Sequence, residues 1–322
     1  MKKKINMDAR RIIFFMVAYL VPWLFVPWIK PGMMSLVFGE YIMTLPTSGV
    51  ILGEWYINKG KKRDFFQKIF IVGSCCCSLY IFICIAGIVK EEYMNIWNRS
   101  LFAVFSLLLF FYCLLYGGES LYPFKNQKKM AIIVGALIVI KGIYLAVFGV
   151  NFNCGKYIIA QVYGIPSIMA LSCFNFLGEE FAWRGYLQKR LQSCVGKRMG
   201  VIILGIIWEL WHIPLWVTTF QLNRQEAGLG IMIVARFINV IGLAIFLGWV
   251  YMKTENVWLC ALLHGMNNAT LTGVADGILE VHGIPIGAII QPVILWMFIF
   301  SKEYRKESSV TQYGGRQKTE VV

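Results

Sequence analysis

Three polar patterns interrupt the apolar second half of the chain, and all contain side chains that can exchange protons or bind a metal ion. The patterns are Gly178-Glu179-Glu180-Phe181-Ala182-Trp183-Arg184, Trp208-Glu209-Leu210-Trp211-His212 and His264-Gly265-Met266-Asn267-Asn268. The chain has only three histidines, and two of them lie in these patterns. Ionisable groups within apolar segments are costly in lipid, so we treat them as candidate functional residues.

Helical spacing pairs several of these side chains. On a helix Glu180 and Arg184 are i,i+4 neighbours, so Arg184 can hold the Glu180 carboxylate ionised through a charge-assisted pair. Glu179 points about 100° away and is free for other contacts. His264 and Asn268 are also one turn apart and share a helix face.

The segments that carry these patterns are long and apolar. Hydrophobic residues make up 58% of the 322 residues and charged residues 15%, whereas a soluble domain has about 25% charged residues. Crossing a membrane takes roughly 20 mostly apolar residues in a helix. Ten blocks approach this length, at 12–29, 41–57, 67–89, 100–117, 130–150, 157–178, 200–218, 229–251, 256–272 and 283–300. We predict an all-α, polytopic transmembrane helical bundle of about eight to ten helices.

The net charge of +14 is concentrated in loops and ends. Basic clusters occur at Lys2–Lys4 with Arg10 and Arg11, at Lys59–Arg63, at Lys125–Lys129, at Lys189–Arg198, and after Lys302. With ten helices all clusters fall on one side, which the positive-inside rule makes cytoplasmic. We predict an integral, multi-pass protein of a bacterial cell membrane with both termini in the cytoplasm. Anionic membrane lipid explains the basic tail, so no nucleic-acid partner is needed.

The polar residues also suggest how the chain is divided. We predict N-terminal transmembrane helices at 1–150, a transmembrane core with the three patterns at 151–302, and a basic, disordered cytoplasmic tail at 303–322. Lys141 is the clearest ionisable residue within a helix of the first half, and the sequence gives it no role. His282 is predicted to be an ordinary residue of an outside loop.

Helix geometry brings the three patterns to a similar depth. At 1.5 Å per residue, Glu179 lies ~15 Å from the basic end of its helix at Lys189. His212 lies ~18 Å past Gly200, and His264 ~12 Å past Asn256. Three helices of alternating direction can therefore bring these groups into one cavity.

Taken together, the patterns resemble the motifs of the CAAX-protease and bacteriocin-processing (CPBP, or Abi) intramembrane peptidases. These motifs are a double Glu with Arg four residues after the second, an aromatic residue four before a His, and a His with Asn four residues later. The stretch from Phe246 through Asn256 is also similar to the family's approach to its third motif. The resemblance covers roughly residues 165–275, and Trp208 stands where the family more often has Phe.

The resemblance implies an intramembrane endopeptidase whose catalytic core is the 151–302 segment. Glu179 with His212 would activate a water molecule, His264 and Asn268 would stabilise the oxyanion, and Glu180 with Arg184 would support the motif helix. Amide hydrolysis needs a base within hydrogen-bond reach of the water and donors aimed at the developing oxyanion. The residue types match these requirements.

The sequence leaves the cofactor open. Glu179, Glu180, His212 and His264 could ligate a divalent metal such as Zn²⁺ with one position free for water, as in a metalloprotease. No HExxH zinc signature is present, and water activation by Glu and His needs no metal. We slightly favour metal-independent catalysis.

The expected substrate is a peptide or a membrane-protein segment. The resemblance implies either a prenylated CAAX-type C-terminus or a bacteriocin, leader peptide or membrane-protein segment, and the short basic loops favour the second group. The alternative is a non-catalytic membrane scaffold, an immunity protein or a transporter that retains the fold. A transporter would favour broken helices in two related halves, and a scaffold would be expected to have lost a motif residue.

Three further polar residues lie close to the second motif. Glu209 is one turn before His212, and it could orient this histidine or simply face a neighbouring helix. Arg236 and Asn239 are one turn apart and could support the cavity.

Overall fold

The computed structural model describes residues 9–60, 62–150, 152–219, 229–275, 280–281 and 286–305. In these residues the secondary structure is helical, apart from one two-residue antiparallel pairing of β1 (Gly149–Val150) with β2 (Glu280–Val281). The predicted all-α bundle is therefore confirmed. His282 lies outside the described residues.

The first half of the chain forms helices that are broken by short irregular turns. They are α1 (Ala9–Phe15), a π-helical turn (Met16–Leu20), two 3₁₀ turns (Pro22–Leu24 and Val26–Trp28), α2 (Met33–Ile42), α3 (Leu45–Ile57), α4 (Phe65–Ile85), α5 (Glu91–Tyr116), α6 (Gly118–Leu121) and α7 (Gln127–Phe148).

The second half carries the three motifs. Its helices are α8 (Cys154–Leu171), α9 (Cys173–Glu180), a π-helix (Phe181–Gln188), α10 (Lys189–Val195), α11 (Lys197–Trp211), α12 (Ile213–Thr218), α13 (Leu229–Thr254), α14 (Val257–Ala275), α15 (Ile286–Met297), a 3₁₀ turn (Phe298–Phe300) and α16 (Lys302–Arg305). Residues 303–305, predicted to begin the tail, thus belong to a short helix.

Among the described residues, most of each predicted apolar block is helical. Among the described residues, seven helical segments are long and apolar enough to cross a membrane, or eight if one bent pair counts as a span. That pair is Cys154–Leu171 with Cys173–Val195, bent by 68°. The bend lies at Ser172, whereas Pro166 lies inside α8.

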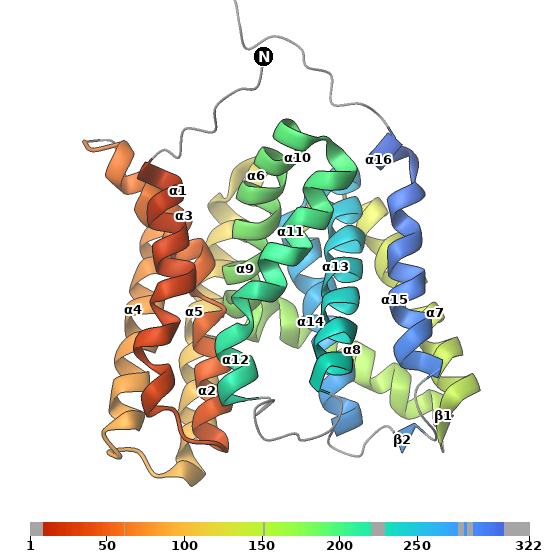
Figure 1. Ribbon diagram of the computed structural model, residues 1–322, viewed down its shortest axis with the longest axis horizontal. Coiled ribbons are helices and arrows are strands. Elements are labelled where there is room, and N and C mark those ends of the chain that lie inside the picture. The colour runs from red at the N-terminus through yellow and green to blue at the C-terminus, as the bar shows by residue number, and fades with distance from the viewer. Residues whose placement is uncertain are drawn as a thin grey trace, which may run out of the picture.

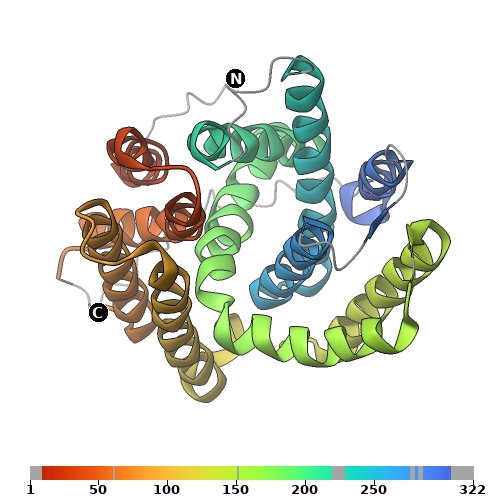
Figure 2. The ribbon, with the colours of Figure 1, turned by 90° about the horizontal axis from the view of Figure 1, so that it is seen from below.

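The bundle has α9 and α11 near its centre (Figure 1). The helices α1, α3, α4 and α5 lie on one side of this centre, and α13, α15 and α7 lie on the other. Seen from below, α8 runs along one edge of the bundle before the chain turns inward into α9 (Figure 2). The motif helices are therefore surrounded by other helices.

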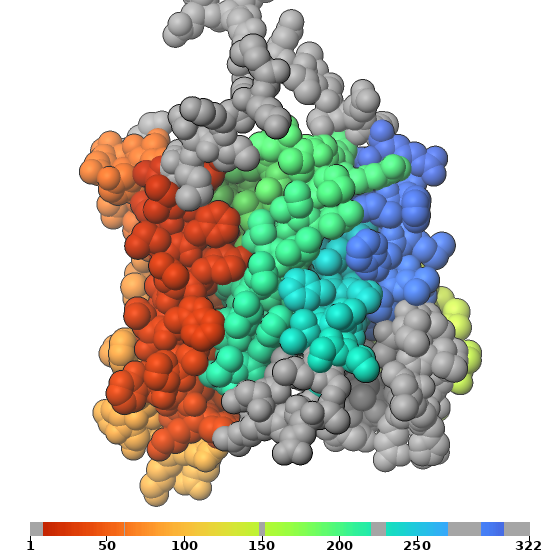
Figure 3. Space-filling model, viewed as in Figure 1, coloured from red at the N-terminus to blue at the C-terminus, as the bar shows by residue number. Residues whose placement is uncertain are grey.

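The start of α1 lies at the same end of the bundle as α6, α10 and α16 (Figure 1). This arrangement agrees with the prediction that the basic clusters share one side, while the orientation toward the cytoplasm stays a prediction. On the face shown in Figure 3, N-terminal residues adjoin residues of α11, and residues of α13 lie on the far side of α11. Large apolar side chains such as Leu210, Val234 and Ile238 are exposed on α11 and α13, as expected for helices that contact lipid.

Small residues allow the motif helices to pack closely. A Cβ at Gly205 of α11 would lie 2.7 Å from the Cα of Ile241 in α13. A Cβ at Gly265 of α14 would lie 2.6 Å from the Ile168 side chain in α8. Close packing at small residues is typical of membrane helices, and here it sets the spacing between helices around the candidate site.

Candidate active site

The two motif glutamates lie where α9 ends and π-helical winding begins. Glu180 is the last residue of α9, and Phe181–Gln188 form the π-helix. Such segments are rare and occur frequently at functional sites. A Cβ at Gly178 would collide with the carbonyl oxygen of Met43. A glycine is therefore needed to seat the glutamates this deep in the bundle.

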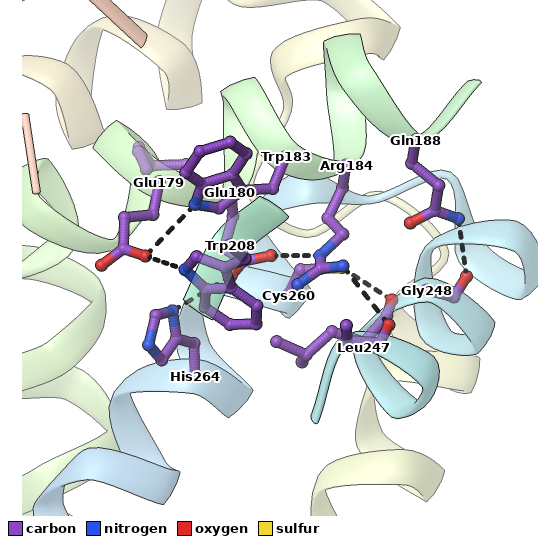
Figure 4. Close-up of polar contacts among 12 residues, drawn as sticks. Glu179, Glu180, Trp183, Arg184, Gln188, Trp208, Leu247, Gly248, Cys260 and His264 are labelled. Atoms are coloured by element: carbon purple, nitrogen blue, oxygen red, sulfur yellow. Dashed lines mark hydrogen bonds and ion pairs between the residues drawn. The ribbon is translucent and has the colours of Figure 1, made fainter. Parts of the chain in front are cut away.

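Glu180 is fully buried and is bonded through both carboxylate oxygens (Figure 4). Its Oε2 accepts a hydrogen bond from Nε of Arg184 at 2.8 Å, and its Oε1 lies 3.0 Å from Nδ1 of His264. Arg184 has no exposed side-chain surface, and its Nη1 donates to the carbonyl oxygen of Ala244 in α13 at 3.3 Å. The Glu180–Arg184 pair expected from the sequence thus ties the double-Glu segment to α13 and α14.

Glu179 is 2% exposed and has two indole donors. Its Oε2 accepts a hydrogen bond from Nε1 of Trp208 at 2.6 Å and another from Nε1 of Trp183 at 3.2 Å (Figure 4). No residue in the described part of the chain donates a hydrogen bond to its Oε1. The Oε2 atom of Glu179 is therefore fixed, and its Oε1 atom can accept a proton or a hydrogen bond from a water molecule.

His264 lies between Glu180 and Asn268. Its Nδ1 faces the Glu180 carboxylate, while Nδ2 of Asn268 lies 3.4 Å from its Nε2. Because a carboxylate accepts hydrogen bonds, Nδ1 carries the proton. The ring also contacts Phe176 and Trp208, with centroid distances of 5.2 and 5.3 Å. The i,i+4 pair predicted from the third motif is present.

His212 directly follows the last residue of α11 and precedes α12, which contains Pro214. Its Nδ1 lies 2.9 Å from the carbonyl oxygen of Trp208 and 3.3 Å from Oε2 of Glu209. Its ring contacts Trp208 and Trp211, with centroid distances of 6.0 and 4.8 Å. The side chain is 15% exposed, so it lies at the edge of the buried cluster.

Trp208 connects the three motifs. Its indole donates to Glu179, its ring packs against His212 and His264, and the Arg184 guanidinium lies 4.9 Å from the ring centroid. The structure thus brings together Glu180, Arg184, His264 and Asn268 by direct contacts, and joins Glu179 and His212 to them through Trp208.

The contacts of the candidate metal ligands do not favour a metal site. No group of three or more His, Cys, Asp or Glu side chains among the described residues is arranged to hold a metal ion. Both oxygens of Glu180 already bond Arg184 and His264, and His212 directs Nδ1 at Trp208 and Glu209. In this conformation both oxygens of Glu180 and Nδ1 of His212 therefore contact protein groups, and a need for a metal stays untested.

Sequence reasoning missed the two indole donors and the salt bridge beside His212. Trp208 was considered only as an aromatic residue in place of Phe, although Phe has no donor. The position of Trp183, four residues after Glu179, was a helical-spacing signal that could have identified the second donor. The contact of Arg236 with Glu209 joins two helices, and spacing within one helix could not reveal it.

The fold and this cluster define an integral, multi-pass helical membrane protein with a buried site of carboxylates and imidazoles. Residues 161–270 match a family model described as Type II CAAX prenyl endopeptidase Rce1-like. A curated relative, CAAX prenyl protease 2 of Methanococcus maripaludis, is 28% identical over 95 residues, which cover 28% of this chain and 34% of the relative. The match thus spans about a third of the relative's length. No solved structure matches the chain.

The matched region contains all three motifs. Over this region the chain is similar to the CAAX protease (CPBP) family, in agreement with the resemblance of the motifs.

Proposed function

We propose that this protein is an intramembrane endopeptidase that hydrolyses a peptide bond of a membrane-associated substrate. The observation that carries the proposal is the environment of Glu179. Two indoles fix its Oε2, while its Oε1 accepts no hydrogen bond from the described residues, and the His264–Asn268 pair lies across Trp208. A fixed base beside hydrogen-bond donors is the arrangement that amide hydrolysis requires.

Glu179 and His212 prepare the nucleophile in the proposed mechanism. Oε1 of Glu179 accepts a proton from water as the water oxygen attacks the substrate carbonyl carbon. Both contacts of His212 Nδ1 are to acceptor oxygens, so Nε2 of the neutral ring is also an acceptor. Removal of such a base typically costs 10²- to 10⁴-fold in rate.

His264 and Asn268 stabilise the tetrahedral intermediate. The Asn268 Nδ2–H group lies against the imidazole edge and can turn its donor to the oxyanion. Nε2 of His264 donates when both ring nitrogens are protonated, a form that the Glu180 carboxylate on Nδ1 stabilises. Collapse of the intermediate breaks the C–N bond, and the proton held by Glu179 moves to the leaving amine.

The substrate is a peptide or membrane-protein segment that reaches the site from the cytoplasmic leaflet. The matched family and the curated relative are both named for CAAX prenyl endopeptidases, which supports a prenylated C-terminus as one class. A leader or bacteriocin-like peptide is the other class, and a bacterial membrane remains our expected location. A panel of peptides from both substrate classes would show which class the protein cleaves.

The test uses the purified full-length protein in lipid nanodiscs with quenched-fluorescence peptides of both classes. Glu179→Gln keeps the shape of the side chain but cannot accept the proton, so we expect hydrolysis to fall at least 100-fold. Glu119→Gln, at an exposed glutamate of α6, is the matched control and should retain full activity. Equal product formation by wild type and Glu179→Gln would reject the catalytic role and favour a scaffold or immunity protein.

A further inference from the structure

Glu209 is a buried carboxylate that the proposed mechanism does not use. It lies in α11 with no exposed side-chain surface. Its Oε1 accepts hydrogen bonds from Nε of Arg236 at 2.7 Å and from Nε1 of Trp216 at 3.2 Å. Nη2 of Arg236 lies 3.3 Å from Oε2. Glu209 is therefore held from α13 and from α12 at the same time.

The other contact of Oε2 is His212. Nδ1 of this ring lies 3.3 Å from Glu209 Oε2 and 2.9 Å from the carbonyl oxygen of Trp208. Both partners are acceptors, so the geometry requires a proton on Nδ1. In the neutral ring the lone pair is then on Nε2, which is the nitrogen that remains for catalysis.

We propose that Glu209, held by Arg236, is a positioning residue that fixes the ring and the Nδ1–H tautomer of His212. This inference rests on the proposed function, since the tautomer matters for the reaction only if His212 acts on the water. A base that is itself oriented by a third group is a recurring arrangement in hydrolytic sites. Here the third group comes from the same helix turn as the histidine, and its own position is set by Arg236.

The competing reading is a purely structural ion pair. A buried Glu209–Arg236 pair would neutralise two charges between α11 and α13, and removal of one partner would leave the other charge without compensation. The two interpretations predict different activities for a variant that removes both charges. Glu209→Gln combined with Arg236→Met eliminates the unpaired charge, so a structural role predicts recovery of activity, whereas positioning predicts that activity stays low.

The experiment combines ¹⁵N NMR of histidine-labelled protein with peptide hydrolysis in nanodiscs. The chain has three histidines, and His212→Ala assigns the His212 signals. We expect the wild-type His212 to be the Nδ1–H tautomer. In Glu209→Gln and in the double variant this tautomer should lose population, and kcat should fall about 10- to 100-fold, the rate equivalent of losing one hydrogen bond to a charged group, with KM nearly unchanged.

The control is Glu303→Gln, which removes a carboxylate that accepts an indole hydrogen bond from Trp249 away from the site. It should change neither the His212 signals nor kcat. If both Glu209 variants keep the wild-type tautomer and kcat, the Trp208 carbonyl alone positions the ring and the proposal is overturned. Recovery of kcat in the double variant also overturns it. A shift of tautomer in a protein without peptidase activity would instead reject the proposed function and leave the positioning of His212 intact.

Discussion

The indole of Trp208 offers a sharp test of how Glu179 is fixed. Trp208→Phe keeps an aromatic ring against His212, His264 and Arg184 but removes the N–H that donates to Glu179 Oε2 at 2.6 Å. A hydrogen bond to a charged group contributes about 1.5–3 kcal/mol. If this bond acts mainly in holding the carboxylate for the reaction, its loss lowers kcat about 10- to 100-fold, since each 1.4 kcal/mol is a factor of ten.

The assay measures kcat, KM and the midpoint of thermal unfolding for wild type, Trp208→Phe and a matched control. Trp249→Phe is that control, because its Nε1 also donates to a carboxylate, that of Glu303, at 3.0 Å. We expect both variants to lose stability and only Trp208→Phe to lose kcat. If Trp208→Phe unfolds earlier but keeps the wild-type kcat, the indole contributes to packing alone and the reasoning about Glu179 is wrong.

Three further predictions follow from single contacts of the site. Asn268→Ala removes an oxyanion donor and should lower kcat about 10²- to 10³-fold with little change in KM, as measured with the same peptides. Glu180→Gln leaves the Arg184 charge buried without a carboxylate and should destabilise the fold by roughly 3–5 kcal/mol, measured by denaturant unfolding in micelles. Gly178→Ala should destabilise it by about 1–3 kcal/mol through overpacking, whereas Gly185→Ala, whose Cβ would be 4.0 Å from its nearest neighbour, should not.

Each of these predictions has a clear contrary result. Wild-type kcat in Asn268→Ala would remove this residue from the oxyanion site. Unchanged stability in Glu180→Gln would show that water or another group compensates the Arg184 charge. Equal stability of the two glycine variants would show that the helix at Gly178 can shift away from its neighbour without cost.

Patterns within one helix were the most predictable part of the structure. The apolar blocks identified the helices because spanning segments need continuous apolar length. The Glu180–Arg184 and His264–Asn268 pairs followed from i,i+4 spacing, and both are present. The similar depth of the motifs followed from the rise per residue and agrees with their contacts around Trp208.

Contacts between helices were not predictable in the same way. The bonds from Trp208 to Glu179 and from Arg236 to Glu209 depend on how α11 packs against α9 and α13. The bend at Ser172 does not coincide with Pro166, the residue of this segment that most often interrupts a helix, so local propensity alone would not place it. The π-helix after Glu180 has no composition signal of its own in the sequence.

Glu179 is the residue on which the proposed peptidase activity depends most. Its most direct test compares the peptide termini of the membrane proteome in cells that express wild type, Glu179→Gln or Glu119→Gln at equal abundance. We expect new termini with wild type and Glu119→Gln that are absent with Glu179→Gln, and their sequences would name the substrate class. Identical termini in all three strains, under conditions in which the protein is needed, would contradict it.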